Sequence, residues 1–276
     1  MKNTPIAFIG GGNMARSLIG GLIADGGDPD VIWAADPSEE QRQILRSRFA
    51  VHTSADNHQV AAQAQVLVLA VKPQLLRAVA ISLAETVRQH RPLVISIAAG
   101  VRHRNLRAWL GEDAAVVRSM PNTPALVSSG ATALFADERV SNQQRQLAES
   151  ILRAVGLTVW VKDETLLDTV TALSGSGPAY FFLVMEALEE AGVQLGLDPD
   201  TARLLTLQTA FGAAKMALES AEHAATLRAR VTSPGGTTER ALAVLQAGNL
   251  KALFASALQA ARDRSHELGD LLGGQS

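Results

Sequence analysis

The stretch that decides the fold is IAFIGGGNMARSLIGGLI, residues 6–23. It starts as a short apolar strand, passes through a glycine-rich turn and continues as helical sequence. Gly10, Gly12 and Ala15 fit the G-x-G-x-x-A pattern of dinucleotide-binding folds, in which the first glycine permits the turn, the second admits a pyrophosphate and the alanine permits close helix–strand contact. The helix that follows would offer free N–H groups to the anion. The stretch predicts a dinucleotide site, with an ordinary tight turn as the alternative.

Short apolar runs alternate with helical sequence through the rest of the first half of the chain. Several runs are apolar nearly end to end, as expected for strands covered on both faces by helices. The alternation predicts a Rossmann-type, doubly wound and mainly parallel sheet over residues 1–162. The predicted strands cover residues 6–10, 31–36, 66–71, 93–99, 115–120, 131–136 and 158–161, and the predicted helices cover residues 14–26, 38–49, 73–89 and 141–154.

Helix-forming residues dominate after about Asp163. This change predicts an all-α second domain over residues 163–276, so the fold class is α/β followed by all-α. Two of its helices, predicted at residues 178–195 and 199–219, are apolar on more than one face, which favours an intertwined dimer over the alternative of a self-contained helical bundle. The predicted helices of this domain cover residues 164–173, 178–195, 199–219, 238–246 and 250–272.

Composition narrows the function classes. The 276 residues are 47% hydrophobic and 19% charged, which is typical of a globular protein that buries a sizeable core. The net charge of -2 gives no electrostatic reason to expect a nucleic acid or an anionic membrane as partner. There is no cysteine, the six histidines show no zinc-binding spacing, and no apolar run is long enough for a membrane helix. We expect a soluble, cytoplasmic protein with a small-molecule partner and no metal.

Residues after the second predicted strand bear on the choice of cofactor. Asp36 stands where an acidic side chain would bind the adenosine ribose and repel a 2′-phosphate, which favours NAD. Ser38 and Arg42 lie just beyond and could instead hold a phosphate. The sequence leaves the choice between NADH and NADPH open.

Other polar or small residues follow later strands, at the edge where open α/β sheets place ligands. Lys72 and Pro73 lie at the carboxyl end of one strand, Ser96–Ala98 ends the next, and Asn122 and Thr123 lie in a loop between two prolines. A solvated lysine and a purely structural loop are the alternative interpretations at Lys72 and Asn122.

Two motifs lie in the predicted helical domain. SGSGPAY, residues 174–180, superficially resembles a nucleophile elbow, but that motif follows a strand and helical sequence precedes this one. We expect a tight turn between two helices, with Pro178 opening the second. SPGGTT, residues 233–238, predicts a helix stop at Pro234 and a new helix from Thr237, whose free N–H groups suit a carboxylate. An ordinary helix cap is the alternative for SPGGTT.

With IGGGNMA, AVKPQ, SIAAGV, MPNTPALV, TALSGSGPAYFF and TSPGGTTERAL in order, the chain resembles the pyrroline-5-carboxylate reductase family along essentially its whole length. The resemblance implies hydride transfer from NADPH, or NADH, to the imine carbon of 1-pyrroline-5-carboxylate, giving L-proline in the last step of proline biosynthesis. It implies a homodimer of interlocked helical domains, which some members assemble into larger rings. Asp36 stands where many relatives carry a neutral or basic residue, so cofactor preference stays open.

The resemblance also implies roles for individual residues. Thr238 is expected to act as the catalytic hydroxyl near the ring nitrogen. The expected substrate-binding residues are Glu164, Ser174, Gly175, Ser176, Ser233, Gly236, Thr237 and Thr238. The expected cofactor-binding residues are Ile9, Gly10, Gly11, Gly12, Asn13, Met14, Asp36, Ser38, Asn57, Ala70, Val71, Lys72, Pro73, Ser96, Ile97, Ala98 and Asn122.

The chemistry of imine reduction fits this set of residues. A cyclic imine of this type gains a proton from water near neutral pH, so the reaction does not require a catalytic histidine or lysine, and orientation of donor and acceptor supplies most of the catalysis. One alternative is a reductase of another small imine or ketone, such as a 3-hydroxyacid dehydrogenase relative, but the expected lysine is missing from GSGPAYFFLVMEALEEAG. The other is a nucleotide sensor that has lost catalysis, which would not need both SGSGPAY and SPGGTT.

Overall fold

The computed structural model describes residues 3–273 and divides into two compact units. The first contains the chain up to Ser176 together with the segment from Ala260 onward, and the second is Gly177–Gln259. These units follow packing rather than sequence order, because the end of the last helix packs within the first unit. The predicted domain boundary at residues 162/163 stays a prediction.

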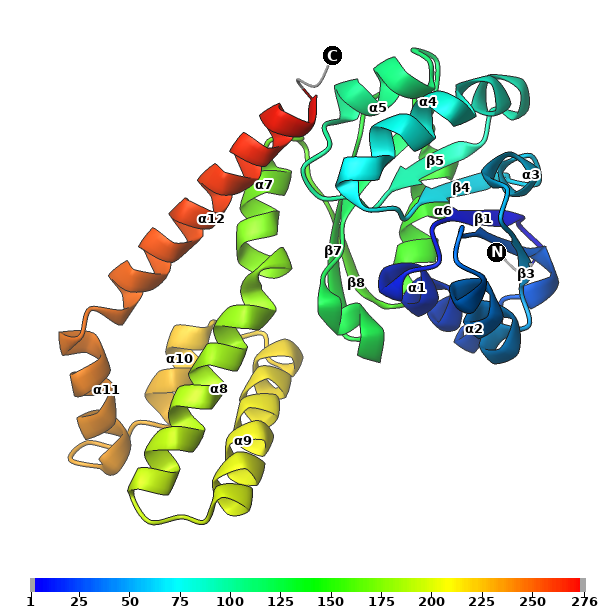
Figure 1. Ribbon diagram of the computed structural model, residues 1–276. Coiled ribbons are helices and arrows are strands. Elements are labelled where there is room, and N and C mark those ends of the chain that lie inside the picture. Colours follow the sequence, from blue (N-terminus) through cyan, green and yellow to red (C-terminus); the bar gives the residue numbers. More distant parts are fainter. Residues whose placement is uncertain (1–2, 274–276) are drawn as a thin grey trace. The chain divides into compact units, whose positions relative to one another are not determined.

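The first unit is built on one eight-stranded sheet, in the order β3-β2-β1-β4-β5-β6-β7-β8 (Figure 1). Strands β1 to β6 are parallel where they pair, and β7 runs antiparallel to β6, so the sheet is mainly parallel as predicted. The antiparallel step was not predicted. The strands are β1 (Ile6–Ile9), β2 (Ile32–Ala35), β3 (His52–Ser54), β4 (Val66–Leu69), β5 (Leu93–Ser96), β6 (Val116–Met120), β7 (Gly130–Ala136) and β8 (Gly156–Trp160).

Helices cover both faces of this sheet, which explains why β1, β4 and β5 are buried at every residue. Side chains alternate between the faces along β1. Ile6 and Phe8 pack with helices α1, α2 and α6, whereas Ala7 and Ile9 pack with α3, α4 and α5. The helices of this layer are α1 (Asn13–Ala24), α2 (Glu39–Phe49), α3 (Asn57–Ala61), α4 (Pro73–His90), α5 (His103–Leu110) and α6 (Asn142–Arg153), with short 3₁₀ turns at η1 (Pro29–Val31) and η2 (Thr123–Val127).

The second unit is all helical, as predicted, but has almost no core of its own. Helices α8 and α9 lie side by side (Figure 1). Within Gly177–Gln259, Ala202 is the one hydrophobic residue that is buried, while Phe181, Phe211 and Leu218 are 67%, 64% and 83% exposed. A self-contained bundle would bury such side chains. The remaining helices are α7 (Leu166–Val170), α8 (Gly177–Gln194), α9 (Pro199–Glu219), α10 (Ala224–Arg230), α11 (Thr237–Ala247) and α12 (Leu250–Gly273).

The tight turn predicted within residues 174–180 is wrong, although a helix does begin beside Pro178, at Gly177. Residues Thr171–Gly175 form a π-type helical turn (η3), and the N–H of Ser176 donates to the carbonyl of Thr171 across 2.8 Å. Ser176 itself keeps right-handed helical angles, and α8 begins at the next residue. The backbone therefore stays helical through this stretch, because the widened turn absorbs an extra residue without breaking the helix.

Within residues 3–273, no single helix is long and apolar enough to cross a membrane. Helices α11 and α12 reach the length and apolar composition of a membrane span only when they are taken together, and the two helices are bent by 50° where they meet.

Candidate functional site

The predicted cofactor residues of the first unit follow the carboxyl ends of neighbouring parallel strands. Ile9 is in register with Leu69, and Leu69 is in register with Ser96. The residues that come next, Gly10, Ala70 and Ile97, therefore lie along one edge of the sheet. This is the edge at which doubly wound sheets bind their ligands.

The glycine-rich turn has the geometry that a dinucleotide requires. Gly10 has φ +104°, and a Cβ there would lie 2.7 Å from the carbonyl oxygen of Ala70. Gly12 is the N-cap of α1, and a Cβ there would meet no atom within 4 Å. No side chain caps α1, and Ala15 is buried against the sheet. The turn thus combines a close approach at Gly10 with open space at Gly12, which fits a pyrophosphate on the first N–H groups of α1.

Asp36 contacts this turn directly. One carboxylate oxygen accepts from the N–H of Gly11 at 2.8 Å, and the other accepts from the N–H of Ser38 at 2.9 Å. Ser38 caps α2 by accepting from the N–H of Gln41, and Asn57 is the first residue of α3. Asp36 thereby fixes the turn after β2 to the turn after β1.

The later strand ends are ordered by short local contacts. Lys72 is exposed at the N-cap of α4, and Pro73 opens that helix. Ser96 is fully buried, and its Oγ accepts from the N–H of Ala98 at 3.4 Å. Its carbonyl accepts from Ser119 Oγ at 2.9 Å. Ser96 therefore shapes the loop that follows β5 rather than pointing into open space.

Asn122 uses its side-chain amide within the protein. Its Nδ2 donates to the carbonyl of Ser174 at 3.0 Å, and its Oδ1 accepts from the N–H of Ala131 at 2.8 Å. These bonds join the loop after β6 to η3 and to β7. The structure supports a positioning role for this side chain, and its role toward a cofactor stays a prediction.

Glu164 lies in a polar cluster with Arg118 and His103 that was not predicted from the sequence. Its Oε1 accepts from Arg118 Nη1 at 2.8 Å and from the N–H of His103. The Arg118 side chain is 6% exposed and that of Glu164 is 23% exposed. The adjoining cavity measures about 20 Å³, room for about one water molecule. The role of Glu164 toward a substrate stays a prediction.

The end of α12 holds the loop that follows β5. Arg102 Nη2 donates to Asp270 Oδ1 at 2.8 Å, and Ser265 Oγ donates to Asp168 Oδ1 at 2.7 Å. A Cβ at Gly269 would lie 3.3 Å from the carbonyl oxygen of Gly100. This close approach explains a glycine inside a long helix. Arg102, Asp168 and Asp270 are further residues that sequence reasoning missed, since their pairing depends on the fold.

The SPGGTT motif forms a tight turn that opens α11 in the second unit. Gly235 has φ +73°, and its N–H donates to Glu239 Oε2 at 2.7 Å. The N–H of Gly236 donates to the carbonyl of Ser233 at 3.0 Å. Helix α11 begins at Thr237, as expected, with Gly236 as its N-cap and no side-chain cap. Its first N–H groups are therefore available to an anion.

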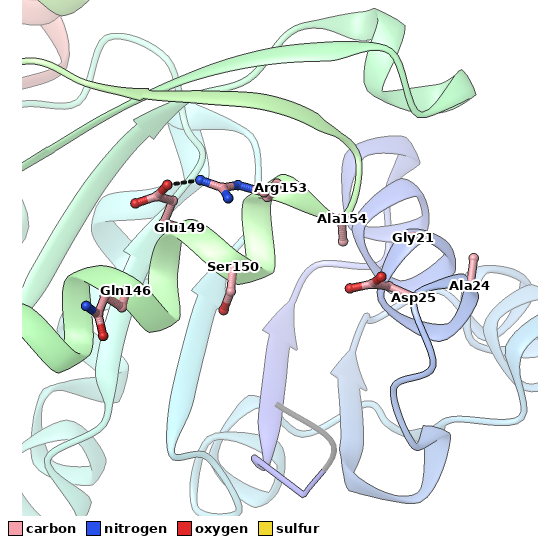
Figure 2. Close-up of a pocket in the computed structure, with 8 residues that line it drawn as sticks. All are labelled: Gly21, Ala24, Asp25, Gln146, Glu149, Ser150, Arg153 and Ala154. Atoms are coloured by element: carbon pink, nitrogen blue, oxygen red, sulfur yellow. Dashed lines mark hydrogen bonds and ion pairs between the residues drawn. The ribbon is translucent and has the colours of Figure 1, made fainter.

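In the first unit, a separate open pocket of about 600 Å³ lies between α1 and α6 (Figure 2). A Cβ at Gly21 would lie 2.5 Å from the carbonyl oxygen of Ala154, so the two helices touch there. Two residues of α6 that line the pocket, Arg153 and Glu149, form an ion pair with each other (Figure 2). The cavity lies at the C-terminal end of α1, roughly 15 Å along the helix from the nucleotide turn at its start. It is not part of the cofactor edge.

The sheet, its glycine-rich turn and the helical unit define a dinucleotide-dependent oxidoreductase. Residues 5–100 match the family described as NADP oxidoreductase coenzyme F420-dependent, and residues 164–268 match the family described as pyrroline-5-carboxylate reductase dimerisation. The chain belongs to the pyrroline-5-carboxylate reductase family.

Individual relatives support this assignment along the full length. The pyrroline-5-carboxylate reductase of Pseudomonas aeruginosa is 51% identical over 99% of this chain and 100% of its own. A solved pyrroline-5-carboxylate reductase from Coxiella burnetii is 52% identical, with a TM-score of 0.93 over 96% of this chain and 98% of its own. The Plasmodium falciparum pyrroline carboxylate reductase, solved with NADP bound, is 28% identical, with a TM-score of 0.86 over 98% of this chain and 99% of its own. The matched dimerisation domain supports an oligomer.

Proposed function

We propose that this protein reduces 1-pyrroline-5-carboxylate to L-proline with NADPH, and with NADH as a second donor, in the last step of proline biosynthesis. The proposed compartment is the cytoplasm. The observation that carries the proposal is that α1 and α11 each have a glycine as N-cap, Gly12 and Gly236, and no side-chain cap. The two glycines lie in the motifs assigned to cofactor and substrate. Each start offers backbone N–H groups to an anion, the pyrophosphate at α1 and the substrate carboxylate at α11.

The residues of the first unit bind and orient the cofactor. The open backbone at Gly12 accommodates the pyrophosphate, while Asp36 fixes the neighbouring turn toward the adenosine end. The loop at Ser96–Ala98 lies at the opposite end of the cofactor edge and is expected to follow the nicotinamide. The bound cofactor supplies the hydride that adds to the imine carbon.

The residues of the SPGGTT turn hold the substrate. Thr238 is half-buried in the first turn of α11, and its hydroxyl is proposed to lie near the ring nitrogen. The nitrogen carries its proton before hydride addition, so the product is a neutral ring amine that protonates in water. No side chain has to deliver a proton to the ring nitrogen during the hydride transfer. Orientation of the two reactants then supplies most of the rate enhancement.

Substitution of Thr238 tests this role. Thr238→Ala should lower kcat/KM for 1-pyrroline-5-carboxylate roughly 10- to 100-fold, because a hydrogen bond to a charged group is worth about 1.5–3 kcal/mol. Thr238→Ser keeps the hydroxyl and should retain most of the activity. NADPH affinity should be the same in all three proteins. Equal turnover in Thr238→Ala would remove this residue from the site.

A homodimer is the proposed assembly. Apolar side chains on α8 and α9, such as Phe182 and Leu204, are 65% and 68% exposed in the single chain. A second copy that interlocks its helices would bury them, since exposed apolar area of this extent is unfavourable in a monomer. The family resemblance also predicts rings of such dimers. Sedimentation equilibrium distinguishes monomer, dimer and larger rings by mass.

A further inference from the structure

Glu39 bridges two arginines at the start of α2. Its Oε2 accepts from Arg42 Nη2 and its Oε1 accepts from Arg46 Nη2. Hydrogen bonds from Arg46 and then Arg42 lower the pKa of Glu39, so the bridging group is an anion. Two guanidinium groups thus converge on one anionic position, and they can do so because residues four apart lie on the same face of a helix.

Each arginine is also anchored by its second nitrogen. Arg42 Nη1 donates to the carbonyls of Asp36 and Pro37 at 2.6 and 3.0 Å, and Arg46 Nη1 donates to Thr53 Oγ1 of β3 at 2.8 Å. The Arg42 side chain is only 14% exposed, whereas Glu39 is 63% exposed. The arginines are therefore held in place by the fold, and Glu39 is the member of the cluster that is free to turn into solvent.

The cluster lies where the adenosine ribose of a dinucleotide is expected. Glu39 follows the end of β2 by four residues, and Asp36 between them accepts from the N–H of Gly11 in the nucleotide turn. In doubly wound folds the residues after the second strand recognise the ribose, and an arginine there accommodates a 2′-phosphate.

Asp36 is less suited to exclude a phosphate than its position in the sequence indicates. Both of its carboxylate oxygens already accept backbone N–H groups, from Gly11 and Ser38. In addition, Arg42 donates to the backbone carbonyl of Asp36, so its positive charge lies beside the negative charge of the Asp36 carboxylate. The local charge is therefore compatible with a phosphate near this turn.

We propose that Arg42 and Arg46 bind the 2′-phosphate of NADPH, and that Glu39 occupies the same anionic position when the nucleotide is absent. The proposal rests on the proposed function, because it assigns the part of that site which selects the cofactor. A phosphate monoester carries about −1.5 to −2 charge near pH 7, so it attracts the two guanidinium groups more strongly than a carboxylate does. An exposed carboxylate gives up such a pair at little cost.

Binding of 2′,5′-ADP and 5′-ADP to the full-length protein tests the proposal without any turnover. By isothermal titration calorimetry, Arg42→Ala and Arg46→Ala should each weaken 2′,5′-ADP about tenfold or more, because each removes charge-assisted hydrogen bonds to phosphate. Affinity for 5′-ADP should stay within about twofold. Arg42 is the more buried of the two arginines, so Arg42→Lys, which keeps the positive charge, is the second variant at this position. Glu39→Gln should strengthen 2′,5′-ADP several-fold, since the competing anion is gone.

The pair formed by Glu85 and Arg88 on α4 is the matched control. It is also an i,i+3 ion pair on a helix surface, but it lies near the C-terminal end of α4 rather than at the cofactor edge. Glu85→Gln and Arg88→Ala should leave both affinities unchanged.

The possible results separate this proposal from the proposed function. If Arg46→Ala and Arg42→Lys weaken both nucleotides equally, or if Glu39→Gln weakens 2′,5′-ADP, the assignment of the cluster is overturned. If 2′,5′-ADP binding follows the expected pattern but 1-pyrroline-5-carboxylate is not reduced, the cluster stands and the proposed function fails. If the substrate is reduced and the NADPH-to-NADH ratio of kcat/KM is the same in Arg46→Ala, the proposed function stands and the cluster does not select the cofactor.

Discussion

Arg118 and Glu164 form an ion pair beneath the end of α12, with Nη1 and Oε1 2.8 Å apart. The pair connects β6 to the first residue matched by the dimerisation family, and the backbone N–H of His103 completes it. The arginine is nearly fully buried, and Glu164 is the one carboxylate with which it forms an ion pair among the described residues. The pair therefore fixes the sheet to the beginning of the helical segment.

Removal of the carboxylate should be costly. Glu164→Ala leaves a buried guanidinium without its partner and should lower the free energy of unfolding by about 3 kcal/mol, the lower end of the range for broken buried pairs. Glu164→Gln keeps an acceptor oxygen and should cost less. Urea unfolding at one fixed protein concentration measures both, since an oligomer's stability depends on concentration. A loss below about 0.5 kcal/mol in Glu164→Ala would contradict a structural role for the pair.

The two glycines of the nucleotide turn should respond differently to alanine. Gly10→Ala places a Cβ 2.7 Å from the Ala70 carbonyl oxygen at φ +104°, so it should cost about 2 kcal/mol of stability and also weaken NADPH. Gly12→Ala meets no atom within 4 Å and should leave stability unchanged while it weakens NADPH. Thermal unfolding and calorimetric titration separate the two effects. Undiminished NADPH binding in Gly12→Ala would show that the pyrophosphate lies elsewhere.

Asn122 should matter for stability through its two side-chain hydrogen bonds. Asn122→Ala leaves the N–H of Ala131 and the carbonyl of Ser174 without their partners and should cost about 2 kcal/mol. Gln143→Ala, at an exposed position of α6, is the control and should change the unfolding free energy by less than about 0.5 kcal/mol. If the two substitutions changed the unfolding free energy equally in urea, the two hydrogen bonds of Asn122 would have no stabilising role.

Asp137 should make stability depend on pH in the acid range. Burial acts to raise its pKa, but hydrogen bonds from the backbone and side chain of Arg139, together with the charges of His103 and Arg139, hold the pKa below the ordinary value of 3.8. Its contribution is therefore fully present above about pH 4, the pKa in the unfolded chain, and is lost as the pH falls through the lower folded pKa.

The variant Asp137→Asn exposes this dependence. The difference in unfolding free energy between wild type and variant should be constant from pH 7 to pH 5 and should shrink from pH 4 to pH 3, as followed by urea unfolding at each pH. A difference that grows on acidification would show that the folded pKa is raised instead.

The strands that could be predicted from sequence are those buried on both faces. Runs such as the one containing Val66–Leu69 are apolar at every residue, because helices cover each side. Strand β3 was missed because its sequence HTS is polar and it pairs only with β2, at the edge of the sheet. Helices α3, α5 and α10 were missed because they are only 5, 8 and 7 residues long, which is too short a window for a helical period to stand out from the sequence around it.

The residues of the site also fall into those that could be predicted from local sequence and those that could not. Glycine turns have a local sequence signature, so the turn at Gly10 and Gly12 and the start of α11 were predicted, while the ligands of these turns stay predictions. Ion pairs such as Arg118 with Glu164 join residues far apart in the chain, and nothing in a sequence indicates the partner of a buried arginine. The pairing of Glu39 with Arg42 and Arg46 is local, but its place beside the nucleotide turn follows from the fold, through β2 and Asp36.

The most direct test of the account is the reaction itself. Purified, folded protein given 1-pyrroline-5-carboxylate and NADPH should oxidise the cofactor and form L-proline in equal amounts, followed by loss of nicotinamide absorbance and by amino-acid analysis. NADH should also support the reaction at a lower kcat/KM. Folded protein that binds NADPH and yet forms no L-proline with either cofactor would contradict the account.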